Sequence, residues 1–231
     1  MNIFVLDKTP YLSAWALSDV HVNKMVVESM QMLTTALHQT GVLSADHLPF
    51  RADGKTRYSG NAHVHHPCTK WVMEGLDKPT MTVRAGTPNE EEIKSVDWDI
   101  WELFVNQGIA NPNTTNVIGI NTPNYCWLWQ YTNNLLHEYK HRFGKTHGCR
   151  EAFDKLPKSR EVNRYCSLVT DFVQAMPDEF KVEGDPVKAY RQYYHTKPAS
   201  FKRKKVEWVR GREAPDWWMQ GLADYIKAVS E

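Results

Sequence analysis

One segment constrains the fold more than any other: residues 19–38, DVHVNKMVVESMQMLTTALH, in which apolar side chains cover most of the helix surface. Its polar residues recur at alternating steps of three and four, which places them along one face of an α-helix. They are His21, Lys24, Glu28, Gln31, Thr35 and His38. A surface helix usually shows the reverse, a narrow apolar stripe on a polar cylinder. We therefore predict a helix buried on most sides, whose narrow polar stripe either lines a cleft or simply reaches solvent.

Proline and capping residues mark the starts of further helices along the chain. We predict helices at residues 10–17, 67–75, 88–104, 123–143, 162–176, 186–194 and 216–229. Residues 2–7, NIFVLD, predict one short strand, and the stretches 44–66 and 106–124 predict long loops. With 42% hydrophobic and 24% charged residues in 231, the chain is typical of a globular protein. The expected fold is mainly α: a single compact helical domain over residues 1–231, with a short N-terminal strand and long irregular loops.

The cysteines show no metal-type spacing such as CxxC, so we expect reduced, buried thiols. They are Cys68, Cys126, Cys149 and Cys166. The first residues, MNIFVLD, are too short and too acidic for a secretory signal. No run approaches the roughly 20 apolar residues of a membrane span. These features predict a cytoplasmic protein without a membrane partner.

A charge pair marks the predicted helix 123–143. Glu138 and Arg142 lie four residues apart at the margin of its apolar face, where they can pair and would be partly desolvated. One interpretation is a structural clamp. In the other, the planar guanidinium of Arg142 binds a phosphate while Glu138 orients it. Lys145 and His147 follow at once, so the same helix end gathers further candidate phosphate-binding groups.

A histidine-rich segment, HVHHPC, precedes the predicted helix that starts at Pro67. Two histidines in alternate positions, His63 and His65, can hold a metal ion if other residues complete the set. The alternative is a loop of exposed or capping imidazoles. His66 lies just before the helix and can titrate near neutral pH, so it suits general acid–base chemistry.

A basic and aromatic segment covers residues 190–212. Its part from 197 to 212 holds seven basic residues and one acid. Cationic side chains pair with phosphates and aromatic ones stack on bases, so the composition predicts contacts with nucleic acid. The candidate residues are Tyr190, Lys202, Arg203 and Lys204, with Arg57 from the similar loop 44–66. A solvated basic loop is the alternative.

Several motifs, read in order, resemble a family of small proteins encoded by tailed bacteriophages. They include DVHVNKMVVESMQML, HVHHPCTKWV, NYCWLWQYTNNLLHEYKHRFGKTH, QAMPDEFK and DPVKAYRQYY. The sequence departs from the family pattern at Val20, where the family has lysine, and at His65, where it has asparagine. The family is largely uncharacterised, and the resemblance implies a role in modifying phage DNA or nucleotides. The matched positions are Asp19, His21, Lys24, Glu28, His66, Pro67, Glu138, Arg142, Lys145 and His147.

The leading hypothesis is an enzyme, a transferase or hydrolase, that acts on DNA or a nucleotide at a base or an attached group. Its candidate catalytic residues are His21, Lys24, Glu28, His66 and Glu138, and its candidate phosphate ligands are Arg142, Lys145 and His147. The sequence has no P-loop and no GxGxxG motif, and it identifies neither the reaction, nor a cofactor, nor the oligomeric state. The alternatives are a metal-dependent hydrolase that uses the HVHH segment with Glu28, and a non-enzymatic protein that binds DNA or a host protein.

Overall fold

The computed structural model describes residues 2–76, 122–157, 168–197 and 206–221, and their regular structure is helical. The α-helices are α1 Pro10–Trp15, α2 Asp19–Gln39, α3 Pro67–Met73, α6 Pro123–Phe143, α7 Arg150–Asp154 and α9 Pro186–Tyr194, and two short 3₁₀ helices are η1 Ala45–His47 and η2 Asp178–Phe180. The prediction of a mainly α fold is confirmed. The predicted helix at 88–104 and most of the predicted loop at 106–124 lie outside the described residues. Residues 216–221 are helical, as predicted for the start of the last helix.

The helices begin where capping chemistry predicts. Proline occupies the first turn of α1, α3, α6 and α9, where its missing N–H has no helical partner to lose. The side chains of Thr9 and Asp185 accept hydrogen bonds from the backbone N–H groups of Leu12 and Lys188. Helix α6 ends at Gly144, whose φ of 67° is the left-handed conformation that terminates many helices.

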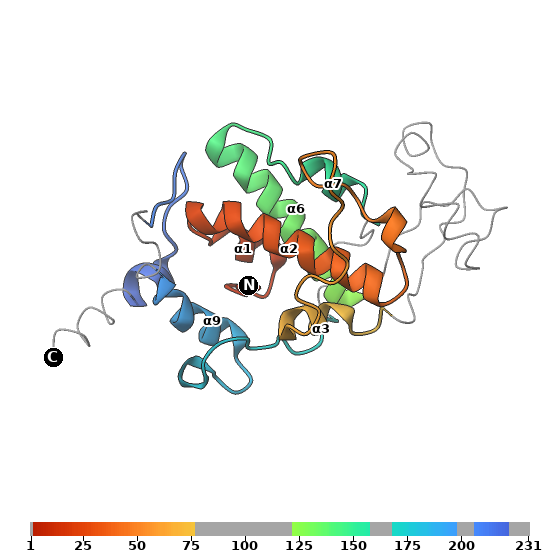
Figure 1. The fold of residues 1–231 in the computed structure, drawn as a ribbon. Coiled ribbons are helices and arrows are strands. Elements are labelled where there is room, and N and C mark those ends of the chain that lie inside the picture. Colours follow the sequence, from red (N-terminus) through yellow and green to blue (C-terminus); the bar gives the residue numbers. More distant parts are fainter. Residues whose placement is uncertain (1, 77–121, 158–167, 198–205, 222–231) are drawn as a thin grey trace, which may run out of the picture.

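Helix α2 lies at the centre of the described fold, with α6 and α7 on one side and α3 and α9 on the other (Figure 1). This position explains its composition, because a helix covered on most sides buries most of its side chains. Val22, Met25, Met30 and Leu33 have no exposed surface. The predicted polar stripe therefore lies on a helix surrounded by other parts of the chain.

The predicted N-terminal strand is not present. Residues 2–6 are buried, but their backbone groups bind side chains and not a neighbouring strand. The N–H of Leu6 donates to the hydroxyl of Ser13, and its carbonyl accepts from Arg191 Nε. The segment lies between α2 and α9 (Figure 1), where no strand is available to pair with it in the described residues.

The predicted helix at 162–176 is also corrected, since its described part, residues 168–176, is irregular. Distant side chains take its backbone groups: Asn124 Oδ1 accepts from the N–H of Thr170, and the hydroxyl of Tyr190 donates to the carbonyl of Val173. Helix α7 was not predicted. The loop at 44–66 is irregular apart from η1 and a single bridge between Phe50 and Arg57.

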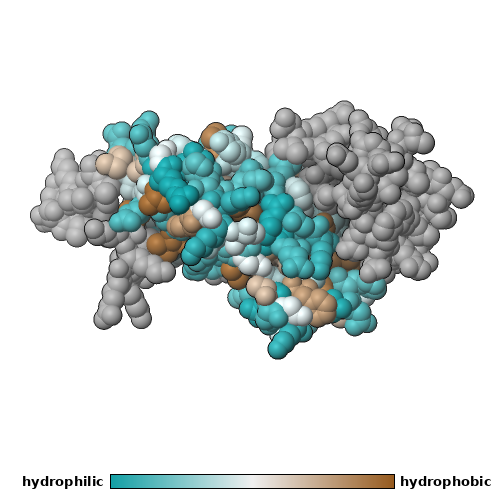
Figure 2. Space-filling model, turned by 90° about the horizontal axis from the view of Figure 1, so that it is seen from above, coloured by the Kyte–Doolittle hydropathy of each residue, from teal (hydrophilic) through white to brown (hydrophobic). Residues whose placement is uncertain are grey.

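Hydrophilic residues predominate on the described part of the face in Figure 2, with hydrophobic ones scattered between them. No helix in the four described ranges has the length and hydrophobicity that crossing a lipid bilayer requires. Cys68, Cys126 and Cys149 are buried, as expected, and form no disulfides, and Cys166 lies outside the described residues.

Candidate functional site

The second half of the polar stripe on α2 holds the chain in place. Thr35 donates from Oγ1 to the carbonyl of Ala62 at 2.8 Å, and His38 Nδ1 lies 3.0 Å from the carbonyl of Leu43. These bonds fix the loop that follows α2. Because buried polar groups need such partners, this half of the stripe has a structural role.

The first half of the stripe forms a different arrangement around Glu28. One oxygen of this carboxylate accepts the backbone N–H of Asn2 at 3.1 Å, and the other lies 3.4 Å from the ammonium of Lys24. The side chain of Glu28 is 14% exposed and that of Lys24 is 59% exposed. The carboxylate of Glu28 is therefore mostly enclosed, and its ion-pair partner Lys24 lies in solvent.

Asn2 connects Glu28 to the helices behind it. Its side-chain oxygen accepts from the hydroxyl of Tyr190 at 3.0 Å and lies 3.6 Å from Cys68 Sγ. Cys68 belongs to the first turn of α3, which His66 caps by accepting the Cys68 N–H at 3.2 Å. Residues from α2, the first segment, α3 and α9 thus meet at one place, which we call the Glu28 corner: Asn2, Lys24, Glu28, Cys68 and Tyr190.

Tyr131 of α6 adds an unusual feature beside this corner. Its hydroxyl is completely buried and has no hydrogen-bond partner in the described part of the chain. Burial, with smaller contributions from Tyr194 and Glu28, raises the pKa of Tyr131 well above its ordinary value. The hydroxyl therefore keeps its proton and could donate a hydrogen bond that no described residue accepts, a type of group that native proteins seldom leave in their interiors.

His21, predicted to be catalytic, is a buried neutral imidazole. It is 2% exposed, and its Nδ1 lies 2.7 Å from the hydroxyl of Tyr194, which also contacts Ser18. Burial, together with the charges of Lys24 and Lys197, lowers the pKa of His21 to about 3. A base this weak is a poor proton acceptor at neutral pH, so the geometry favours a positioning role for His21 over the predicted acid–base role.

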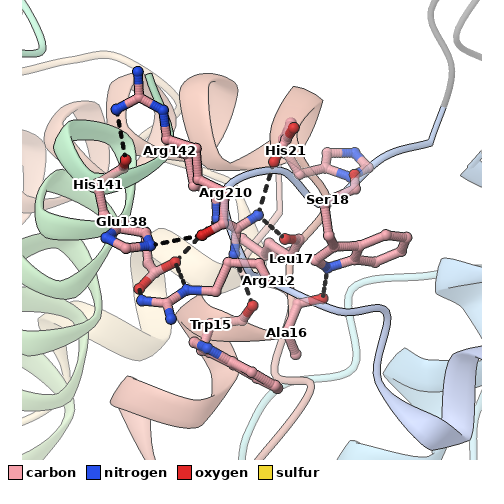
Figure 3. A network of polar contacts seen from close by, with 12 residues as sticks. Trp15, Ala16, Leu17, Ser18, His21, Glu138, His141, Arg142, Arg210 and Arg212 are labelled. Atoms are coloured by element: carbon pink, nitrogen blue, oxygen red, sulfur yellow. Dashed lines mark hydrogen bonds and ion pairs between the residues drawn. The ribbon is translucent and has the colours of Figure 1, made fainter. Parts of the chain in front are cut away.

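Glu138 and Arg142 form the structural clamp that was one of the two interpretations. Figure 3 shows Glu138 between the guanidinium groups of Arg142 and Arg212. Its oxygens lie 3.0 Å from Arg142 Nε and 2.9 and 2.8 Å from two nitrogens of Arg212. Burial alone would raise the pKa of Glu138, but the hydrogen bonds and charges of the two arginines outweigh it and lower the pKa.

The remaining donors of Arg142 go to the corner between α1 and α2. Nη1 donates to the carbonyl of Leu17 at 2.7 Å and to Asp19 Oδ1 at 3.1 Å, and Nη2 donates to the carbonyl of Trp15 at 2.8 Å. The side chain has no exposed surface. A phosphate therefore has no access to this guanidinium, which corrects the prediction that Arg142 binds phosphate. The carboxylate oxygens of Glu138 are likewise occupied, by Arg142 and Arg212.

The other predicted phosphate ligands have separate environments. His147 is buried, its Nδ1 accepts the N–H of Cys149 at 3.1 Å, and it makes a hydrogen bond with the backbone of Asn23. Tyr190 is buried and cannot stack on a base, which corrects its predicted role. Lys145 is exposed, and Arg57 lies over the ring of Phe50 at 4.1 Å. Lys202, Arg203 and Lys204 lie outside the described residues.

The histidine segment provides no metal centre within the described residues, where no three His, Cys, Asp or Glu side chains gather as metal ligands would. His63 and His65 are exposed, and His66 is the cap of α3. Sequence reasoning missed Asn2, a member of the Glu28 corner, and Tyr131 beside it. No helical spacing relates either residue to Glu28, and only the fold brings them to it.

Of the five predicted catalytic residues, the structure brings Lys24 and Glu28 together at the Glu28 corner, and His66 is linked to it through the N–H of Cys68. It places Glu138 in the clamp and His21 in the interior beside Tyr194. Comparison with models of protein families, with curated proteins and with solved structures finds no match for this chain.

Proposed function

We propose that this protein is a bacteriophage enzyme that modifies DNA or a nucleotide, at a base or an attached group, with Glu28 as its general base. The observation that carries the proposal is the state of the Glu28 carboxylate. It is mostly enclosed, yet it reaches solvent beside Lys24, and among the described residues only one backbone N–H and one ammonium bind it. The motifs shared with the phage family support the choice of DNA or a nucleotide as the substrate.

Each group of the corner has a role under this proposal. Glu28 accepts a proton from the attacking group, and a positioned carboxylate in such a role contributes about 10²–10⁴-fold to the rate. The ammonium of Lys24, 3.4 Å away, offsets the charge of Glu28 and offers a contact for a substrate phosphate. His66, which caps α3 at the N–H of Cys68, is the candidate second acid–base group. Transferase and hydrolase chemistry both fit these roles.

Glu28→Gln is the test of this proposal. DNA and free deoxynucleotides are incubated with the protein in a bacterial extract that supplies small co-substrates, and the resulting nucleosides are analysed by mass spectrometry. We expect the wild type to give a nucleoside of changed mass, and Glu28→Gln to give it at least about 100-fold more slowly. Glu151→Gln is the matched control, because that carboxylate is 87% exposed and outside the corner. Equal rates for wild type and Glu28→Gln would contradict the proposal.

DNA binding separates an enzyme from a simple binder. The triple variant Lys202→Ala, Arg203→Ala and Lys204→Ala tests whether the basic segment contacts phosphates. Each lost phosphate contact lowers the slope of log affinity against log salt concentration by about 0.9 for duplex DNA. We expect the triple variant to have a shallower slope and Glu28→Gln to bind as the wild type does. A protein that binds DNA but yields no altered nucleoside would be a binder and not an enzyme.

A further inference from the structure

A hollow lies between the first turns of α2 and the last turns of α6, away from the Glu28 corner. Its volume is about 230 Å³, and Asp19, Val20, Asn23, Tyr139 and Phe143 line it. At about 100° per residue, Asn23 and Glu28 are separated by roughly 140° around α2. The hollow and the Glu28 corner therefore flank the exposed ridge of the same helix from opposite sides.

One wall of the hollow is aromatic. The rings of Tyr139 and Phe143 lie 4.8 Å apart at an angle of 56°, and both are partly exposed. His147 packs its edge against Tyr139 at 4.7 Å. Because His147 is itself bound to the backbone at Cys149 and Asn23, it holds this ring against the first turns of α2. The wall is thus a supported stacking surface.

The opposite wall is polar. The Oδ1 atom of Asp19 is bound by Arg142 at 3.1 Å, which neutralises the carboxylate and fixes its direction. Asn23 is exposed, and its side-chain amide has no hydrogen-bond partner among the described residues. One carboxylate oxygen and an amide that both donates and accepts therefore face two rings across a small space.

We propose that this hollow binds a nucleobase, which stacks on Tyr139 and Phe143 and makes hydrogen bonds along its edge to Asn23 and Asp19. The size of the hollow fits one ring system, since pockets for drug-sized ligands measure about 300–1,000 Å³ and this one about 230 Å³. The sugar and phosphate then remain outside. The choice of a base among planar rings rests on the proposed function. Because the ridge of α2 separates the hollow from Glu28, the base held here is a base of the DNA substrate other than the one that reacts.

An arginine side chain from a protein partner is the main competitor for such a surface, because guanidinium also stacks on aromatic rings. The ion pair between Asp19 and Arg142 argues against it. A cation would be attracted to an uncompensated carboxylate, whereas this one is already paired. A neutral base needs no net charge from its site, only hydrogen-bonding groups and a ring to stack on.

NMR titration of the isotope-labelled protein tests the inference, with the four deoxynucleosides as ligands and deoxyribose 5-phosphate as the base-free probe. We expect at least one nucleoside to shift the side-chain amide signals of Asn23, and the base-free probe to leave them unchanged. Asn23→Ala and Tyr139→Leu should each weaken binding about tenfold. His137→Ala, an exposed change on the same helix, is the matched control and should have no effect.

Two results would overturn the inference: nucleosides that shift the Asn23 signals no more than deoxyribose 5-phosphate does, or free arginine that binds more tightly than every nucleoside. Asn23 is exposed, so Asn23→Ala remains informative even if Tyr139→Leu fails to fold. Glu28→Gln should bind nucleosides as the wild type does. If Glu28→Gln loses turnover but nucleosides do not bind the hollow, this site is rejected and the proposed function stands. If nucleosides bind the hollow but the wild-type protein shows no turnover, the site stands and the proposed function is rejected.

Discussion

Two carboxylates on the two long helices have similar burial and opposite surroundings. Glu138 of α6 is 6% exposed and binds two guanidinium groups, whereas Glu28 of α2 is 14% exposed and binds one ammonium and one backbone N–H. The difference in exposure is small. What separates them is the number of protein partners that already occupy their oxygens. A saturated carboxylate stabilises the fold, and an unsaturated one retains capacity for a substrate.

The largest effect is expected from removing Arg142, which lies at the centre of the contacts that occupy Glu138. Arg142→Met leaves Asp19 and the carbonyls of Trp15 and Leu17 without their donor, so we expect a loss of about 3–5 kcal/mol in the free energy of unfolding. In a chain of this size that corresponds to a fall of roughly 6–20 °C in Tm. Urea titration measures it. Lys140→Ala, an exposed change on the same helix, should alter stability by less than about 0.5 kcal/mol.

The same substitution at both carboxylates sharpens the comparison. Glu138→Gln weakens contacts with two guanidiniums, so we expect a loss of about 2–3 kcal/mol. Glu28→Gln should lose less than about 1 kcal/mol, because its contact with Lys24 is exposed. Chemical denaturation of the two variants checks this. A larger loss for Glu28→Gln would mean that the Glu28 corner is structural as well.

His21 predicts how stability depends on pH. Its pKa is about 3 in the folded protein and 6.5 in the unfolded chain, so only the unfolded chain binds this proton between those values. The stabilisation is complete above pH 6.5 and decreases as the pH falls toward 3. Between pH 6 and 4.5 this residue alone should remove about 2 kcal/mol. We expect the free energy of unfolding of His21→Gln to fall by about 2 kcal/mol less than that of the wild type over this pH range, measured by urea titration at each pH. An equal fall in the two proteins would contradict the buried, neutral state of His21.

Two buried tyrosines give the smallest expected effects and a matched pair. The hydroxyl of Tyr194 binds His21 and Ser18, so Tyr194→Phe should lose about 1–2 kcal/mol. The hydroxyl of Tyr131 has no hydrogen-bond partner within the ranges that the structure describes, so Tyr131→Phe should be neutral or slightly stabilising in thermal unfolding. A loss from Tyr131→Phe as large as that from Tyr194→Phe would show that the Tyr131 hydroxyl is bound after all.

Much of the fold follows from local sequence signals. The helices that begin at Pro10, Pro67, Pro123 and Pro186 were predicted because a proline and its preceding cap determine a helix start from adjacent residues. Residues 2–7 and 168–176 were predicted wrongly because side chains far away in the sequence decide their conformation. The hydroxyl of Tyr190, for example, binds the carbonyl of Val173. Local patterns carry no information about such bonds.

The site was predictable to a similar degree. Helical spacing placed Lys24 and Glu28 on one face, and it placed Glu138 and Arg142 at an apolar margin. It did not show that main-chain carbonyls of Trp15 and Leu17 saturate Arg142. Every residue has a backbone carbonyl, so the pattern of side chains does not predict which carbonyls a distant arginine will bind. The contribution of Asn2 to the Glu28 corner is a backbone N–H and is hidden for the same reason.

The corner between α1 and α2 has a consequence for the order of events during synthesis. Arg142, which binds Asp19 there, follows it by 123 residues, and Trp208, which donates to the carbonyl of Ala16, follows it by 192. A chain leaving the ribosome therefore exposes this corner with its acceptors unfilled until the partners have been translated. We expect nascent chains that stop before α6 to depend on chaperones, and chains that extend past residue 213 to be released from them.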